Sequence, residues 1–362
     1  MEFKTTLEIV DKDLEKKEKL REIEYDRNYK SLFLRRHSEW DYGTEDNNYL
    51  DLGFLTKDGH QMADESAVEL GEKMVEINNK VEEDFEASIY ESPSFIPSSN
   101  PKELENKDDN PNYDERFPEE IKPQRAMMTG LSYEERIFGG LAPGKGAMHH
   151  DGLANWDVPD PVLSRNKLKT TSVSKRLGDF MENVDCEDKS QLGRLIGEFH
   201  KLKGELYSNS EEFWTAFIRN ELPEELLKSL KACNGSTSLD LTRNMIDFIS
   251  EKKEKTAEEK KEIVLAITHG ETMDSFLHYL GLFLETKGET DHGLDEILFG
   301  YNEGFDAHID SEGNLVIAIN VVEKIEGEKK SSIRLIEVKL DEFEDYINKQ
   351  DGFISTVNRE KN

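Results

Sequence analysis

Cysteine is almost missing from this chain: only Cys186 and Cys233 occur among 362 residues. Two cysteines provide no disulfide framework and no cysteine cluster for a metal ion, and we expect both to be buried or inert. Long apolar runs are missing as well. No stretch approaches the ~18 apolar residues of a membrane span, and the N-terminus is charged throughout, unlike an export signal. We therefore expect a cytoplasmic protein without a membrane segment.

Positively charged residues are far outnumbered by negatively charged ones. The chain has 47 Lys and Arg against 78 Asp and Glu, which gives a formal net charge of -31 at pH 7. A surface this acidic repels nucleic acid and anionic membranes, so we expect neither as a partner. The same field opposes a small phosphorylated substrate, so a phosphate site would have to gather its few cations inside a pocket. Arginines beside histidines are therefore the residues of interest.

Apolar and charged residues each make up 35% of the chain. This apolar fraction is low for one compact globule, so we expect some segments to be solvated helices or loops. The segment before residue 29 predicts an exposed helix, the proline-rich stretch at 93–123 predicts a long loop, and apolar residues at helical spacing between 165 and 232 predict further helices. The predicted divisions are a charged helical arm at 1–28, a core built from 29–140 and 235–345, a helical insertion or cap at 141–234, and a C-terminal tail at 346–362.

Two short apolar runs, far apart in sequence, each end in polar residues that include a histidine. Ser31–Leu34 leads to Arg36 and His37, and Ile263–Ile267 leads to His269. In an open α/β sheet the carboxyl ends of parallel strands meet in one crevice, so we expect the two histidines to converge.

The fold that these patterns predict is a three-layer α/β/α sandwich with a mostly parallel sheet. The apolar runs at 314–319 and 333–338 predict an edge hairpin of that sheet. The site is expected at the carboxyl ends of the strands, with the helical insertion as a cap over it.

Four blocks of sequence resemble the histidine phosphatase superfamily, in the branch that is phosphoglycerate mutase-like. LFLRRHSEW at 32–40 resembles the strand that ends in Arg-His-Gly-Glu, and LTKDGHQMA at 55–63 resembles the helix start Leu-Thr-x-x-Gly-x-x-Gln-Ala. LSYEERIFGGL at 131–141 and AITHGETMDSFLHYL at 266–280 resemble the acid-bearing segment and the second histidine strand. The resemblance covers 29–75, 131–141 and 238 to about 320.

The resemblance implies a phosphohistidine mechanism. His37 would attack phosphorus through one neutral ring nitrogen while its other nitrogen donates to a backbone carbonyl. Arg36, His269 and one further arginine would bind the phosphoryl oxygens, so that no metal ion or other cofactor is required. Glu135 would protonate the leaving oxygen and later activate water, and Glu271 is the alternative acid.

Two departures from the family pattern bear on activity. Ser38 replaces the glycine that follows the nucleophile, so its hydroxyl would either donate to phosphate or add bulk that lowers activity. The second arginine of the family lies in a Ser-Pro-x-x-Arg-Ala-x-x-Thr block, and only Arg125-Ala126-Met127-Met128-Thr129 has the right local spacing here. Arg125 is therefore the candidate, and Arg136 is the alternative.

Phosphomonoester hydrolysis is the activity that these residues favour, on a small phosphorylated substrate or a phosphoprotein. A phosphomutase is the second enzymatic interpretation. Ser38 and the displaced arginine motivate a third, a pseudo-phosphatase that acts as a binding module. A catalyst needs two arginines, both histidines and a carboxylate around one phosphate group. A site that lacks the second arginine would therefore favour the binding module. The sequence leaves the substrate and the oligomeric state open.

Overall fold

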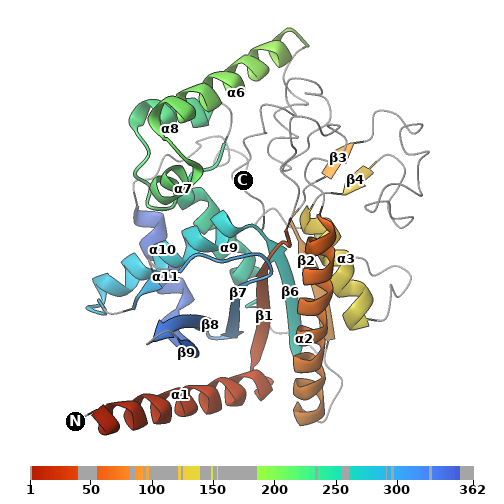
Figure 1. Cartoon of the computed structure of the whole chain (residues 1–362), viewed down its shortest axis with the longest axis vertical. Coiled ribbons are helices and arrows are strands. Elements are labelled where there is room, and N and C mark those ends of the chain that lie inside the picture. Colours follow the sequence, from red (N-terminus) through yellow and green to blue (C-terminus); the bar gives the residue numbers. More distant parts are fainter. Residues whose placement is uncertain are drawn as a thin grey trace.

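Figure 1 shows a computed structural model of the chain. It describes residues 2–39, 55–81, 86–92, 95–97, 121–123, 125–138, 148–149, 153, 186–232, 235–253, 261–290, 292–294, 297–325 and 328–350. In the part of the chain covered by these ranges, no helix is both long enough and apolar enough to cross a membrane.

The centre of the molecule is a seven-stranded sheet in the order β5-β2-β6-β1-β7-β8-β9. The first four strands in that order are parallel, and the next three run antiparallel to their neighbours. Long β8 and β9 form the edge hairpin that the sequence predicts. The strands are β1 (Tyr29–Arg36), β2 (Glu86–Glu91), β5 (Met148–His149), β6 (Glu262–Thr268), β7 (Gly304–Asp310), β8 (Asn314–Ile325) and β9 (Glu328–Lys339). A separate ribbon pairs β3 (Phe95–Pro97) with β4 (Ile121–Pro123).

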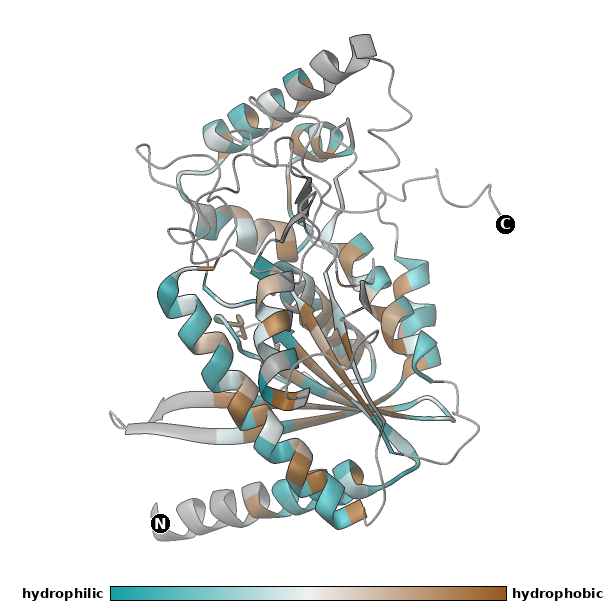
Figure 2. Cartoon of the chain, turned by 90° about the vertical axis from the view of Figure 1, so that its right-hand side faces the viewer, coloured by the Kyte–Doolittle hydropathy of each residue, from teal (hydrophilic) through white to brown (hydrophobic). Residues whose placement is uncertain are grey.

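Helices cover both faces of this sheet, because alternate residues of the central strands point to opposite sides. Phe33 of β1 packs with α2 (Lys57–Val81) and α3 (Arg125–Phe138) on one face. Leu32 and Leu34 pack on the other face, with α9 (Ser238–Glu251), α10 (Gly270–Thr286) and α11 (Leu340–Lys349). Figure 2 shows the apolar residues gathered on the strands between the helices. The predicted three-layer sandwich is thus the observed fold.

Three further helices pack around a small apolar cluster of their own. They are α6 (Cys186–Leu206), α7 (Ser210–Ile218) and α8 (Glu224–Ala232). Phe199, Phe213 and Phe217 fill the cluster, and Leu241 ties it to α9. These helices lie beyond the carboxyl ends of the central strands, where the sequence places a cap (Figure 1). The full extent of an insertion at 141–234 stays a prediction.

The sequence predicts an exposed charged arm, but the N-terminal helix α1 (Glu2–Tyr25) is not exposed along its whole length. Leu14 is 57% exposed, but Leu20 and Ile23 are buried, because the last turns of α1 pack against the body. At the other terminus, the predicted boundary at residue 345 is wrong: α11 continues to Lys349, and Ile347 lies buried in the main core.

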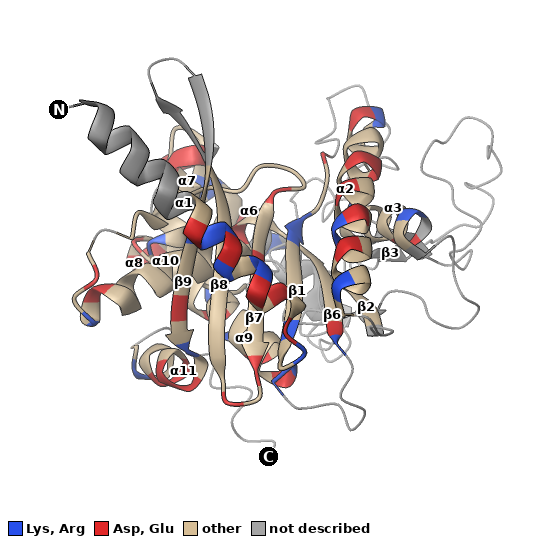
Figure 3. Cartoon of the chain, turned by 90° about the horizontal axis from the view of Figure 1, so that it is seen from below, with Lys and Arg blue, Asp and Glu red and all other residues tan. Residues whose placement is uncertain are grey.

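The charges of the described elements are mixed in sign. Seen from the amino ends of the parallel strands, basic residues are scattered among acidic ones, and no basic stripe crosses the elements coloured in Figure 3. Ion pairs such as Lys253 with Asp341 and Lys287 with Glu342 join several of them. This view agrees with the acidic composition of the chain.

Candidate active site

Strand pairing brings the two predicted histidines together. Arg36 of β1 pairs with Thr268 of β6, so the residues that follow, His37 and His269, leave adjacent parallel strands at the same level. The His37 backbone N–H donates to the Thr268 carbonyl at 2.9 Å, and the two ring centroids are 5.0 Å apart. Both imidazoles are buried. The convergence predicted from the strand ends is therefore present.

The hydrogen bonds of His37 determine which ring nitrogen is available for chemistry. Its Nδ1 lies 2.8 Å from the Ser38 carbonyl oxygen. A carbonyl can only accept, so Nδ1 carries the proton and Nε2 keeps its lone pair. Burial, followed by the fields of Arg125 and His269, lowers the pKa of His37 well below its usual value. The ring is thus neutral near pH 7, with a nucleophilic nitrogen at Nε2.

Arg125 is the arginine that reaches this nitrogen. It begins α3, and its Nε donates to His37 Nε2 at 3.0 Å. Arg136 lies more than two turns further along the same helix, where its side chain is 51% exposed and pairs with Asp64 at 2.5 Å. The structure thus brings together Arg125 and His37, and Arg136 belongs to the surface.

Arg36 is the last residue of β1, and only part of its guanidinium is hydrogen-bonded within the described residues. Its Nη1 donates to the Phe299 carbonyl at 2.6 Å, and its Cζ lies 4.7 Å from the centroid of the Tyr301 ring. The guanidinium packs on Gly270, where an added Cβ would lie 3.0 Å from Nε and Cζ. Arg36 Nε is buried and has no hydrogen-bond partner among the described residues. A buried donor of this kind calls for an acceptor from a ligand.

His269 offers a similar buried group. Its Nε2 lies 3.0 Å from Ser92 Oγ, whereas Nδ1 has no partner within the described part of the chain. Burial and the nearby Arg125 and Arg36 lower the pKa of His269 well below its usual value, so this ring is also neutral. When the Ser92 hydroxyl donates to Nε2, the proton of the neutral ring lies on Nδ1, which then becomes a donor for a ligand.

The backbone dipoles of two helices add to the positive charges of Arg36 and Arg125. α10 begins directly after His269, and its N-cap makes no side-chain capping bond. α3 begins at Arg125. The N-terminal end of a helix carries partial positive charge and orphan N–H groups, which favour anions. Two arginines, two neutral histidines and two helix N-termini therefore form a site suited to a compact oxyanion with several oxygens.

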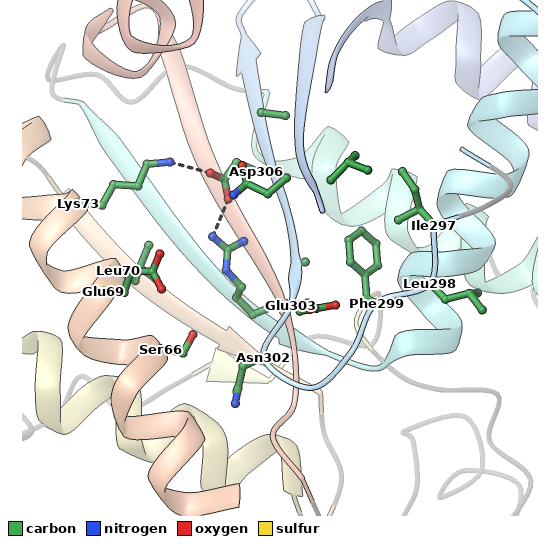
Figure 4. Close-up of a pocket in the computed structure, with 15 residues that line it drawn as sticks. Ser66, Glu69, Leu70, Lys73, Ile297, Leu298, Phe299, Asn302, Glu303 and Asp306 are labelled. Carbon is green, nitrogen blue, oxygen red and sulfur yellow. Dashed lines mark hydrogen bonds and ion pairs between the residues drawn. The ribbon is translucent and has the colours of Figure 1, made fainter. Parts of the chain in front are cut away.

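Arg35, the neighbour of Arg36, points to the opposite face of the sheet and serves the fold. Its Nη2 pairs with Asp306 at 2.7 Å, and Lys73 pairs with the other oxygen of that carboxylate at 2.7 Å. Although burial alone would raise the pKa of Asp306, these two cations hold it below its usual value. Arg35, Lys73 and Asp306 border a cavity of about 480 Å³ between α2 and the loop that includes Phe299 and Asn302 (Figure 4).

Ser38 does not present its hydroxyl proton to the anion site. Its Oγ donates to the Gly59 carbonyl at 2.5 Å and accepts from Asn302 Nδ2 at 2.9 Å. A hydroxyl has one proton, so donation to phosphate, which the sequence suggests, would require Ser38 to change partner. The role of Ser38 as a phosphate ligand stays a prediction.

The roles of Glu135 and Glu271 as general acids stay predictions. Glu135 lies in α3, but its side chain is outside the described part of the chain. Glu271 occupies the first turn of α10 and is partly buried. Asp274, which the sequence did not single out, is buried one turn further along. Its Oδ1 accepts from the Phe299 N–H at 3.2 Å, and burial raises its pKa to about 8.

The sequence also left several supporting side chains without a role. Ser92, with Pro93, matches the Ser-Pro start of the family's arginine block, and it follows β2 just as the histidines follow their strands. Thr129 lies within the arginine block and accepts from the Ser38 N–H at 3.0 Å. Asn302 and Tyr301 belong to no recognised motif, because only the packing of the loop before β7 places them here.

The fold places two arginines and two histidines together at the carboxyl ends of the parallel strands of a mixed α/β sheet. No family model matches the sequence, and no curated protein sequence matches it. Solved structures do match. A mycobacterial glucosyl-3-phosphoglycerate phosphatase complexed with VO3 shares 11% identity at a TM-score of 0.35, covering 86% of this chain and 98% of that one.

Two other matches have related names. Phosphoglycerate mutase from Bacillus anthracis shares 13% identity at a TM-score of 0.34, covering 88% of this chain and 97% of that one. A phosphoserine phosphatase mutant from Entamoeba histolytica, in complex with phosphoserine, shares 12% identity at a TM-score of 0.32, covering 86% and 98%.

Proposed function

We propose that this chain is a phosphoryl-transfer enzyme of the histidine phosphatase superfamily that hydrolyses phosphomonoesters through a phosphohistidine on His37. The observation that carries the proposal is the state of His37: Nδ1 donates to a carbonyl, while the lone pair of Nε2 faces Arg125 at 3.0 Å. Arg36 Nε and His269 Nδ1, which have no hydrogen-bond partner within the described ranges, lie buried beside it. This combination supplies a nucleophile and donors for the oxygens of a phosphoryl group.

In the first step, His37 Nε2 attacks phosphorus, so an N–P bond forms as the bond to the leaving oxygen breaks. Arg125 moves its N–H from Nε2 to a phosphoryl oxygen, and Arg36 and His269 donate to the others. A carboxylic acid protonates the leaving oxygen. In the second step the same group, now ionised, takes a proton from water, which attacks phosphorus and frees His37.

Glu135 is the proposed acid and Glu271 the alternative, both from the family resemblance. This sequence of steps requires no metal ion. A phosphomutase would share the first step and return the phosphoryl group to a second hydroxyl instead of to water. A binding module would share the anion site without turnover. The second arginine that a catalyst needs is supplied by Arg125, which favours an enzyme over the binding module.

The test is hydrolysis of an aryl phosphate in the presence of a metal chelator, comparing wild type with His37→Ala and His200→Ala. His200 lies in α6, outside the site, and is the matched control. We expect wild type and His200→Ala to turn over and His37→Ala to lose activity by several orders of magnitude. Equal activity in all three proteins would sink the proposed nucleophile, and no activity across a broad panel of phosphate esters would favour the binding module.

A further inference from the structure

Ser38, which stands where the related family has glycine, is held on every side in this structure. The side chain is fully buried. Its hydroxyl donates to the Gly59 carbonyl at 2.5 Å in the first turn of α2 and accepts from Asn302 Nδ2 at 2.9 Å in the loop before β7. Its backbone N–H donates to Thr129 Oγ1 at 3.0 Å in α3. Three separate elements thus fix one residue.

The remaining polar group of Ser38 is its carbonyl, which holds the nucleophile. His37 Nδ1 donates to this oxygen at 2.8 Å, and that bond keeps the lone pair on Nε2. Any rotation of the Ser38 peptide unit would move the carbonyl and release the ring. The bonds that immobilise Ser38 therefore also decide the tautomer and direction of the His37 ring.

The surroundings are shaped for this contact. At Gly59 an added Cβ would lie 2.0 Å from the Glu39 carbonyl oxygen, so only glycine lets the chain after Ser38 pack this closely on α2. Asn302 adopts a left-handed backbone with φ of 58°, which asparagine tolerates better than most residues. Figure 4 shows Asn302 on the loop that borders the cavity beside α2. The same loop provides the Phe299 carbonyl for Arg36.

We propose that Ser38 and Asn302 form a positioning pair that fixes the orientation of the His37 ring, so that serine at this position aids the reaction instead of impairing it. The kinetic part of this inference rests on the proposed function. In this role neither residue acts on the reacting atoms directly; both act through the Ser38 carbonyl. Replacement by glycine would free the backbone and leave the Gly59 carbonyl and the Asn302 amide without their buried partner.

The kinetic test compares Ser38→Gly and Ser38→Ala with Asn302→Gly, which keeps the left-handed backbone and removes the amide. Ser31→Ala and Asn220→Gly are matched controls: Ser31 is buried on β1, and Asn220 has φ of 55° in the turn after α7. On an aryl phosphate we expect kcat to fall about tenfold in the three test variants with KM unchanged, since the phosphate-binding groups remain. The controls should keep the wild-type kcat.

A double variant, Ser38→Ala with Asn302→Gly, should be no slower than the slower single variant, because both remove the same interaction. A higher kcat in Ser38→Gly than in wild type would overturn the inference in favour of harmful bulk at Ser38. An unchanged kcat in all test variants would overturn it as well.

A spectroscopic readout separates this inference from the proposed function. Nitrogen NMR of histidine-labelled protein, with His37→Gln for assignment, reports the proton position on the His37 ring without any turnover. We expect the proton on Nδ1 in wild type and a mixture of tautomers in Ser38→Gly. If wild type forms no phosphoenzyme, the proposed function fails, and the tautomer result still decides the positioning pair. Identical ring signals in both proteins would overturn the pair.

Discussion

Removing Arg125 tests the anion site most sharply, because the chain supplies its own control on the same helix. Arg125 donates to His37 Nε2 at 3.0 Å, whereas Arg136 is 51% exposed and pairs with Asp64. Arg125→Met removes one charged donor from a buried site where negative charge gathers in the transition state. Losses from single donors of this kind are about 10² to 10³ in rate. Arg136→Met removes an exposed ion pair worth about 0 to 1 kcal/mol, so the expected change is less than about fivefold.

The pH profile gives the same prediction a second readout. After burial, the charge of Arg125 is the next largest cause that lowers the pKa of His37. His37 must be neutral to attack, so kcat/KM falls on the acid side as this ring takes up a proton. Without Arg125 the pKa of His37 rises, and the acid limb moves to higher pH. The assay is kcat/KM on an aryl phosphate from about pH 4 to about pH 9. Equal losses in Arg125→Met and Arg136→Met, or an acid limb that stays in place, would refute this reasoning.

Two further predictions concern buried ionisable groups. Burial raises the pKa of Asp274 to about 8, so this carboxyl is neutral at pH 7 and ionises beside Arg36 only above that pKa. We expect KM to rise in wild type as the pH passes about 8 but to stay flat in Asp274→Asn; parallel curves would contradict this role. Lys261 is fully buried, and its Nζ donates to the carbonyls of Asp26 at 3.1 Å and Tyr29 at 2.7 Å. Lys261→Met should lower the free energy of unfolding in urea by about 1 to 3 kcal/mol, because these carbonyls lose their donor. Lys253→Met, at a partly exposed ion pair, is the control, and equal losses would count against the assignment.

The fold was largely predictable, because its signals are local. Runs such as 32–34 and 263–267 are apolar throughout, as expected of strands that are buried on both faces. The polar residues that follow each run mark the carboxyl edge of the sheet, and β1 and β6 place His37 and His269 as this pattern indicates. The helix α2 is expected from the block at 55–63, which resembles a helix start of the related family.

Other features depend on contacts between distant segments, and sequence patterns do not contain them. The burial of Leu20 and Ile23 follows from the packing of α1 on the body. Arg125 and Arg136 stand on one helix, so only its orientation shows which of them reaches His37. Asn302 carries no motif, and its contact with Ser38 arises from the return of the chain into β7.

The position of the phosphoryl group on a trapped intermediate tests the central claim most directly. Wild-type protein, quenched in base during turnover of a phosphate ester, would be digested, and the phosphorylated peptide and ring nitrogen would be identified by mass spectrometry and phosphorus NMR. The structure predicts phosphate on His37 at Nε2, because Nδ1 donates to the Ser38 carbonyl. Phosphate on His269, phosphate on Nδ1 of His37, or turnover without any phosphohistidine would contradict the account.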